Sequence, residues 1–189
     1  MDYKTNLKAY LDREIEVIKS LDLESINKVM NVLEEAKAKH KTTYICGNGG
    51  SAATASHFVC DFNKGLNDEA SQFKFQCLSD NTPIMMAISN DIGYDEVFRY
   101  QIKGRIEEGD ILFGISGSGN SKNVINAMVH AKSVGAKTIA LVGFNGGKMK
   151  QIADYCIHVN IDNMQIAEDV HMIMDHLMMY VMNHENGCK

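Results

Sequence analysis

Features that would mark this chain as a membrane, secreted or disulfide-bonded protein are absent from its sequence. No apolar run reaches the roughly 18 residues of a membrane-spanning helix, and residues 1–8 are polar, unlike a secretory signal. The 5 cysteines are an odd number without CxxC spacing, so we expect neither a disulfide framework nor a thiolate zinc site. We predict a cytoplasmic protein in which each cysteine is a small buried apolar residue. These cysteines are Cys46, Cys60, Cys77, Cys156 and Cys188.

An excess of basic residues is also missing. The 19 lysines and arginines are outnumbered by 24 aspartates and glutamates, which gives a formal net charge of -5 and a pI near 5.8. We therefore expect no nucleic acid and no membrane as partner, and small-molecule chemistry is favoured. With 189 residues, 45% of them hydrophobic, the chain can bury a sizeable core, and we predict a single domain over residues 1–189.

Apolar residues follow two patterns along the chain. Over residues 1–40 they recur at helical spacing around a break near residues 21–24, which predicts two helices before any strand. Over residues 41–160, five short apolar runs alternate with helical segments. The runs cover residues 44–46, 73–78, 111–115, 138–142 and 155–159. This alternation predicts an α/β fold: a five-stranded parallel sheet with helices on both faces, a three-layer sandwich of the flavodoxin or Rossmann kind.

A methionine-rich helix is predicted over residues 164–184, within a C-terminal segment of residues 161–189. Its methionines cannot all lie on one stripe, so we expect this helix to be covered on several sides, with another subunit as one candidate for the cover. The methionines concerned are Met172, Met174, Met178, Met179 and Met182.

Another helix is predicted to begin around Pro83, the only proline of the chain, because the first turn of a helix does not need the amide that proline lacks. After this helix, Asn90 and Asp91 are expected in a loop. There they either cap the next helix or contact a sugar hydroxyl, and the sequence does not decide between these roles.

The first predicted strand runs into a glycine-rich turn. Residues 43–52 read Thr-Tyr-Ile-Cys-Gly-Asn-Gly-Gly-Ser-Ala, and a helix is expected from Ser51 to about Asn63. Gly47, Gly49 and Gly50 allow the backbone to approach a ligand closely, while the first amides of the helix are left unpaired. Such a turn is suited to binding a phosphate group.

A second turn of this kind, from Ser116 to Ser121 (Ser-Gly-Ser-Gly-Asn-Ser), follows the third strand. In a parallel sheet both turns lie at the carboxyl edge, where ligands bind. One such turn is explained as well by helix capping, in which serine and asparagine satisfy the first amides. Two of them favour a phosphate site. Neither a Gly-Lys-Ser/Thr nor a Gly-x-Gly-x-x-Gly motif follows these strands, which disfavours a nucleotide.

Histidines and carboxylates share faces of two helices. His57 and Asp61 lie four residues apart after the first turn, a spacing that suits either a surface ion pair or a functional site. Glu168 and His176 are about 80° apart around the C-terminal helix, so both can face one cleft. If the two pairs meet, they suit zinc or another divalent ion, or proton transfer. The spacing alone does not bring them together.

These segments together resemble the sugar isomerase (SIS) domain and, within it, the phosphoheptose isomerases. The resemblance covers nearly the whole chain: a helical lead-in, Cys-Gly-Asn-Gly-Gly-Ser-Ala, Ser-Asn-Asp-x-Gly-Tyr, the serine turn, Gly-x-x-Gly-Gly-Lys-Met and a terminal helix with histidines. It implies a SIS fold and a homotetramer. It also implies isomerisation of sedoheptulose 7-phosphate to D-glycero-D-manno-heptose 7-phosphate, in heptose biosynthesis for surface polysaccharide.

The resemblance implies roles for individual residues. The substrate would contact Asn48, Gly49, Gly50, Ser51, Asn90, Asp91, Ser116, Gly117, Ser118, Ser121 and Glu168. Zinc or another divalent metal would be held by His57, Asp61, Glu168 and His176. Proton transfer would depend on Asp61, Glu168 and His176.

Two positions depart from the family pattern. Asp61 stands where the family usually has a catalytic, metal-binding glutamate, and its carboxylate is retracted by one methylene, roughly 1.5 Å. Glu168 stands where the family usually has a glutamine; the added charge strengthens binding of a cation and offers a second base. The sequence leaves open which of the two carboxylates is the base.

Two other functions suit the same residues. The first is isomerisation of a different phosphosugar. The second is phosphosugar binding without catalysis, because the fold also resembles a bacterial regulator that binds the replication initiator protein. That regulator lacks the acidic residue that Asp61 provides here, so an isomerase acting through an enediol is the favoured function.

Overall fold

Five strands form one parallel sheet at the centre of the molecule. The computed structural model describes residues 1–65 and 72–185, so Cys188 and its predicted burial lie outside the described residues. The strands are β1 (Thr43–Cys46), β2 (Phe75–Cys77), β3 (Ile111–Ser116), β4 (Lys137–Val142) and β5 (Tyr155–His158), in the order β2-β1-β3-β4-β5. Each neighbouring pair is parallel. The predicted five-stranded parallel sheet is confirmed.

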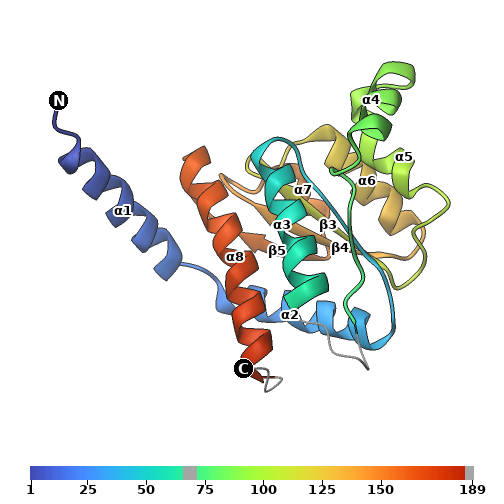
Figure 1. Cartoon of the computed structure of the whole chain (residues 1–189), viewed down its shortest axis with the longest axis horizontal. Helices are drawn as coiled ribbons and strands as arrows, with labels where there is room; N and C mark the ends of the chain where they lie inside the picture. The colour runs from blue at the N-terminus through green and yellow to red at the C-terminus, as the bar shows by residue number, and fades with distance from the viewer. Residues whose placement is uncertain (66–71, 186–189) are drawn as a thin grey trace.

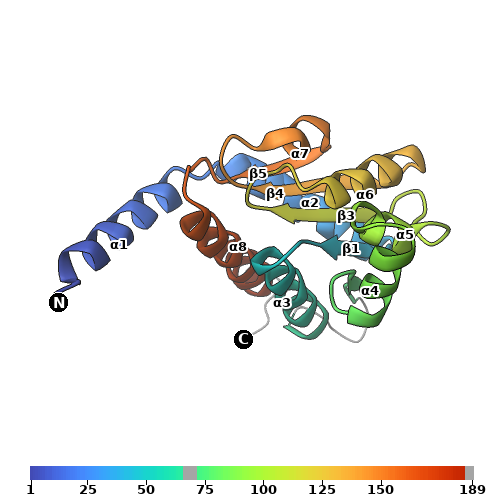
Figure 2. The ribbon, with the colours of Figure 1, turned by 90° about the horizontal axis from the view of Figure 1, so that it is seen from above.

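Helices cover both faces of this sheet, which confirms the three-layer sandwich (Figures 1 and 2). One face packs against α2 (Leu23–Ala38), α3 (Gly50–Gly65) and α8 (Met164–Glu185). The other face packs against α4 (Thr82–Asp91), α5 (Val97–Ile102), α6 (Lys122–Ser133) and α7 (Gly147–Ile152), with the short 3-10 helix η1 (Tyr94–Glu96) between α4 and α5.

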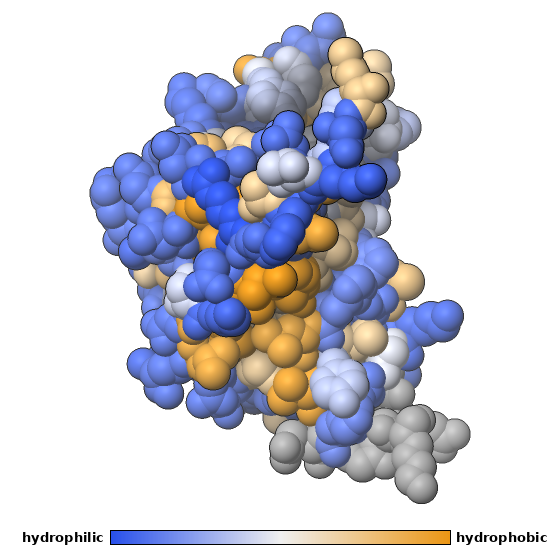
Figure 3. Space-filling model, turned by 90° about the vertical axis from the view of Figure 1, so that its left-hand side faces the viewer, coloured by the Kyte–Doolittle hydropathy of each residue, from blue (hydrophilic) through white to orange (hydrophobic). Residues whose placement is uncertain are grey.

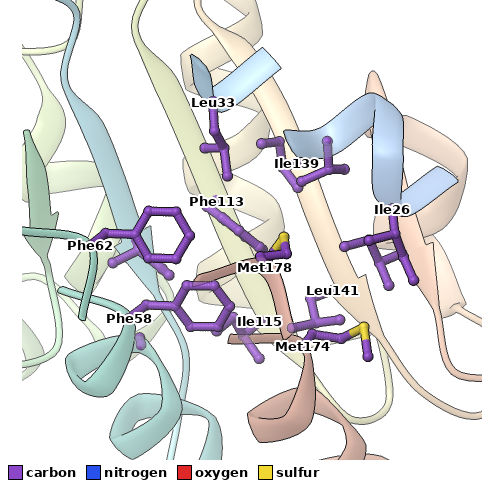
Figure 4. Packing of buried hydrophobic residues seen from close by; sticks show 14 of the residues in the cluster. Ile26, Leu33, Phe58, Phe62, Phe113, Ile115, Ile139, Leu141, Met174 and Met178 are labelled. Atoms are coloured by element: carbon purple, nitrogen blue, oxygen red, sulfur yellow. The ribbon is translucent and has the colours of Figure 1, made fainter. Parts of the chain in front are cut away.

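The core between the sheet and the α3–α8 layer is built from aromatic and methionine side chains. Phe58 and Phe62 on α3 pack on Phe113 of β3, while Met174 and Met178 of α8 reach the same cluster (Figure 4). Each such side chain contributes roughly 1.5–3 kcal/mol when it is fully buried. This packing fixes α3 against α8, and these two helices carry most of the predicted catalytic and metal-binding residues.

The helix α1 (Lys4–Lys19) extends away from this sandwich (Figure 1). The predicted break between α1 and α2 is confirmed, and the Asp22 carboxylate caps α2 by accepting from the amides of Glu24 at 3.0 Å and Ser25 at 3.2 Å. Several apolar residues of α1 remain exposed: Leu7, Leu11, Ile15 and Ile18.

Two local predictions are wrong. Asn90 and Asp91 are the last residues of α4 rather than a loop, because the apolar helical pattern continues through Ile88 to the end of the helix. Cys60 is exposed, because it lies on the side of α3 that faces away from the core. Cys46 is buried as predicted, while two further cysteines are partly buried: Cys77 and Cys156.

Candidate functional site

The two glycine-serine turns meet at the point where the order of the strands in the sheet reverses. The chain leaves β1 toward β2 on one side, and later leaves β3 toward β4 on the other, so β1 and β3 are central neighbours. Their register pairs Cys46 with Gly114, and both turns follow at the carboxyl edge. Open α/β sheets bind ligands at such a switch point.

Paired asparagine side chains join the two turns. The Asn48 amide donates to the Asn123 oxygen at 3.0 Å, and the Asn123 amide donates back to the Asn48 oxygen at 2.9 Å. Asn123 is only 2% exposed. The Tyr94 hydroxyl also donates to the Asn48 oxygen, at 2.7 Å. Asn123 and Tyr94 had no predicted site role, since a sequence does not show that residues 75 positions apart form a pair.

The first turn brings its backbone against a carboxylate. Gly49 has a φ of +54°, which favours glycine, and α3 begins at the next residue. A Cβ atom on Gly50 would lie 2.7 Å from Oε2 of Glu168, so a larger residue here would displace the end of the Glu168 side chain. Ser51 is buried. Glu168 therefore lies beside the first turn, at the N-terminal end of α3.

The second turn holds its hydroxyls together. The Ser116 and Ser121 oxygens are 2.9 Å apart, and the Gly119 amide donates to Ser116 at 3.2 Å. Ser121 precedes α6, but among the described residues its side chain makes no capping bond to that helix. Simple helix capping therefore does not explain this serine. Ser118 faces a hollow that it shares with the aromatic Phe144 and with several polar residues.

Asn90 and Asp91 lie farther out, at the end of α4. The Asn90 amide donates to the Asp91 carboxylate at 2.8 Å. Asn90 also lines a surface hollow with Tyr94, whose hydroxyl reaches Asn48. Asn90 is thus connected to the first turn through one tyrosine.

The helices α3 and α8 run side by side in the same direction. Near their starts, Gly50 lies against Glu168, and near their ends Gly65 lies against Met179, where a Cβ atom would be 3.2 Å from the sulfur. Because helical side chains lean toward the N-terminal end, groups on both helices lean toward the turns. The side chains that these two helices turn toward each other therefore lean toward the carboxyl edge of the sheet.

Two imidazoles and a carboxylate converge where α3 and α8 face each other. The Nε2 atoms of His57 and His176 are 3.1 Å apart, and they lie 3.6 Å and 3.9 Å from Oδ2 of Asp61. The side chains are 43%, 55% and 17% exposed respectively. Three of the four expected metal ligands are thus brought together across 119 positions of sequence. Glu168, the fourth, lies outside this group, beside Gly50.

A second aspartate, Asp175, belongs to the same group of side chains. Asp175 is fully buried, and one of its oxygens lies with the ligand atoms of the other three residues, all within 4.8 Å of one another. Burial raises the pKa of Asp175 to about 7, and the Asp61 carboxylate adds to this. One turn earlier on α8, burial lowers the pKa of His171 to about 4, so this imidazole is neutral at pH 7. No ligand role was predicted for Asp175, since the sequence does not distinguish this aspartate from a surface one.

The fold and the paired serine-glycine turns define a class of protein. The model of the SIS domain family matches residues 3–143, which is well over half of the chain. The chain therefore belongs to the SIS domain family.

Full-length relatives narrow this class. The phosphoheptose isomerase of Helicobacter pylori (strain Shi470) is 37% identical over 171 residues, which are 90% of this chain and 87% of that protein. The phosphoheptose isomerase of Aliarcobacter butzleri (strain RM4018) is 34% identical over 181 residues, 95% of this chain and 96% of that protein. The structure of phosphoheptose isomerase from Neisseria gonorrhoeae has a TM-score of 0.88 at 29% identity, covering 97% of this chain and all of that one. Within the SIS family, the chain belongs to the phosphoheptose isomerases.

Proposed function

We propose that this protein interconverts sedoheptulose 7-phosphate and D-glycero-D-manno-heptose 7-phosphate, an aldose–ketose isomerisation that supplies heptose for surface polysaccharide. One observation carries the proposal: α3 begins in the first turn at Gly50 and holds His57 and Asp61 beside His176. A single rigid helix thus connects a phosphate-binding turn to groups that can transfer protons. The names of the relatives, all phosphoheptose isomerases, support a heptose phosphate.

The phosphate would be held where the two turns meet. Serine hydroxyls and the unpaired amides at the starts of α3 and α6 provide donors, and the helix dipoles favour an anion there. The residues proposed for this role are Ser51, Ser116, Gly117, Ser118 and Ser121, with Asn48, Gly49, Gly50, Asn90 and Asp91 around the sugar. The Asn48–Asn123 pair keeps the two turns at a fixed separation, which orients the substrate for reaction.

Proton transfer would involve Glu168 and His176. A substrate that reaches from the turns to the histidine cluster passes Glu168, which lies beside Gly50. Glu168 removes the proton from C1 of the ketose and returns it to C2, while His176 moves a proton from O1 to O2. Asp61 lies beside both imidazoles, with its Oδ2 atom 3.6 Å and 3.9 Å from their Nε2 atoms, and would orient them. This mechanism assigns the base to the position where the family usually has glutamine.

The cluster of His57, Asp61 and His176 also suits a divalent metal such as zinc. A tetrahedral zinc site with ligand bonds of about 2.0–2.1 Å places neighbouring ligand atoms roughly 3.3 Å apart. The observed separations among His57, Asp61 and His176 are 3.1, 3.6 and 3.9 Å, close to that value. When bound, such a metal would act as a Lewis acid that polarises the carbonyl and stabilises negative charge on the substrate oxygens.

A homotetramer in the cytoplasm is part of the same proposal. The exposed apolar residues of α1 support assembly, and the side of the molecule from which α1 projects shows apolar side chains gathered over its middle and lower part (Figure 3). Four described cysteines are free thiols, as is usual in a reducing compartment. None of the helices within residues 1–65 and 72–185 is long and apolar enough to cross a membrane.

The test is conversion of sedoheptulose 7-phosphate by the purified protein, with and without a chelator. We expect turnover that falls after chelation and returns with zinc. A His176→Ala variant should lose at least about a hundredfold in kcat, since general acid–base groups contribute roughly 10²–10⁴-fold. Full activity of that variant would overturn the role of His176, and full activity in chelator would overturn the role of the metal.

Two controls distinguish the proposed reaction from isomerisation of a different phosphosugar and from phosphosugar binding without catalysis. A panel of shorter phosphosugars tests the substrate, because an isomerase for another sugar would turn one of them over faster. A regulator would bind the sugar phosphate without any turnover. Either result would contradict the proposed reaction.

A further inference from the structure

Asp175 is a carboxylate that the proposed proton transfer does not use. Its side chain is 0% exposed, although the next residue, His176, is exposed. None of the described residues forms a hydrogen bond with either of its carboxylate oxygens. Burying a carboxylate without a donor is costly, and such groups in folded proteins are usually paired or bound to a metal. We therefore expect the Asp175 carboxylate to have a binding partner that satisfies its oxygens.

The position of Asp175 indicates what that partner is. One of its oxygens lies within 4.8 Å of ligand atoms from His57, Asp61 and His176. A proton shared between Asp61 and Asp175 would relieve their repulsion, and a hydrogen bond joins the two imidazole Nε2 atoms, which are 3.1 Å apart, but no single proton serves all four groups. A divalent cation would satisfy all four groups at once. Two carboxylates and two neutral imidazoles also balance its charge of two.

We propose that Asp175 is the fourth ligand of the divalent metal, so that this chain binds it through His57, Asp61, Asp175 and His176 rather than through Glu168. The inference rests on the metal site of the proposed function and changes its ligands. It also gives Asp175 the place in the cluster that Glu168, which lies beside Gly50, does not fill.

The test measures Zn²⁺ affinity of the full chain by competition with a chromophoric chelator. Asp175→Asn and Glu168→Gln make the same change, acid to amide, on the same helix, so each is the matched control of the other. We expect Asp175→Asn to weaken Zn²⁺ binding by about tenfold or more, since even outer partners of metal ligands contribute 10–100-fold. Glu168→Gln should change the affinity by no more than about twofold. The visible spectrum of bound Co²⁺ should change only in Asp175→Asn.

Thermal unfolding shows whether the variants fold. Without metal, Asp175→Asn should be at least as stable as the wild type, because it removes an unpaired buried carboxylate, but Zn²⁺ should raise its Tm less. Wild-type affinity in Asp175→Asn, together with loss in His176→Ala, would overturn the inference and leave the metal site intact. Loss in Glu168→Gln alone would also overturn it. If the wild type bound no Zn²⁺, the inference would fail with the metal, while turnover of sedoheptulose 7-phosphate would show separately whether the isomerase proposal stands.

Discussion

Two carboxylates, Asp61 and Glu168, differ from the family pattern in opposite directions: one side chain is shorter, and the other gains a charge. If Glu168 has taken over proton abstraction, Glu168→Gln should reduce kcat by roughly 10²–10⁴-fold with little change in KM. The double variant Asp61→Glu with Glu168→Gln restores the residues that the family usually has. It should therefore recover at least about tenfold of the lost kcat. Steady-state kinetics on the ketose substrate check both effects.

The matched single variant is Asp61→Glu, which adds a methylene beside two imidazoles and should lower activity on its own. A double variant less active than either single one would show that the two positions act independently and would contradict the exchange of roles. Nearly full activity in Glu168→Gln would instead identify Asp61 as the base.

For single residues, the sequence predicted which side chains form the site better than it predicted their burial and their neighbours. His57 and Asp61 share one side of α3 as their spacing suggested, but their meeting with His176 was implied only by the family resemblance. Asp175 was not predicted as a ligand. Its burial depends on how α8 packs against α3, which helical spacing alone does not determine.

The elements were the most predictable part of the chain. All five strands were predicted because each is a short apolar run between helical segments, and the two turns because glycine and serine mark them. The contact between the turns was not predictable in the same way, since Asn48 and Asn123 meet only once β1 and β3 have paired.

This contact gives a prediction for the connection between α6 and the first turn. Asn123→Ala should raise KM for the sugar phosphate by about tenfold or more, because it leaves the Asn48 amide without its partner and frees the first turn from the second. It should also cost about 1–3 kcal/mol of unfolding free energy, as expected when a buried polar group loses its hydrogen bonds. Asn126→Ala is the control: this residue, one turn further along α6, donates instead to the Asp95 carbonyl at 3.0 Å. Equal KM values in the two variants would show that the Asn48–Asn123 pair does not position substrate.

At the scale of the whole molecule, α1 projects from the sandwich and leaves apolar side chains exposed. This helix meets the sandwich mainly at α8, where Tyr10 donates to Asp169, and hydrogen bonding to that carboxylate raises the pKa of Tyr10 to about 12. The exposed Leu7, Leu11 and Ile15 recur at helical spacing and form a stripe with no cover from the described part of the chain. A stripe of this kind on a projecting helix is a surface that the proposed tetramer would bury between its subunits.

The assembly prediction follows from that stripe. Each apolar side chain buried between subunits would contribute roughly 1.5–3 kcal/mol, so a single charge there should be enough to disrupt the contact. We expect Leu11→Asp to convert a tetramer to smaller species in size-exclusion chromatography with light scattering, while its circular dichroism stays that of the folded chain. Arg13→Asp places the same carboxylate on the opposite side of α1, two residues away at about 100° per residue, and should leave the tetramer intact. A tetramer that survives Leu11→Asp, or that falls apart equally in Arg13→Asp, would mean that the apolar stripe is not the surface through which the subunits meet.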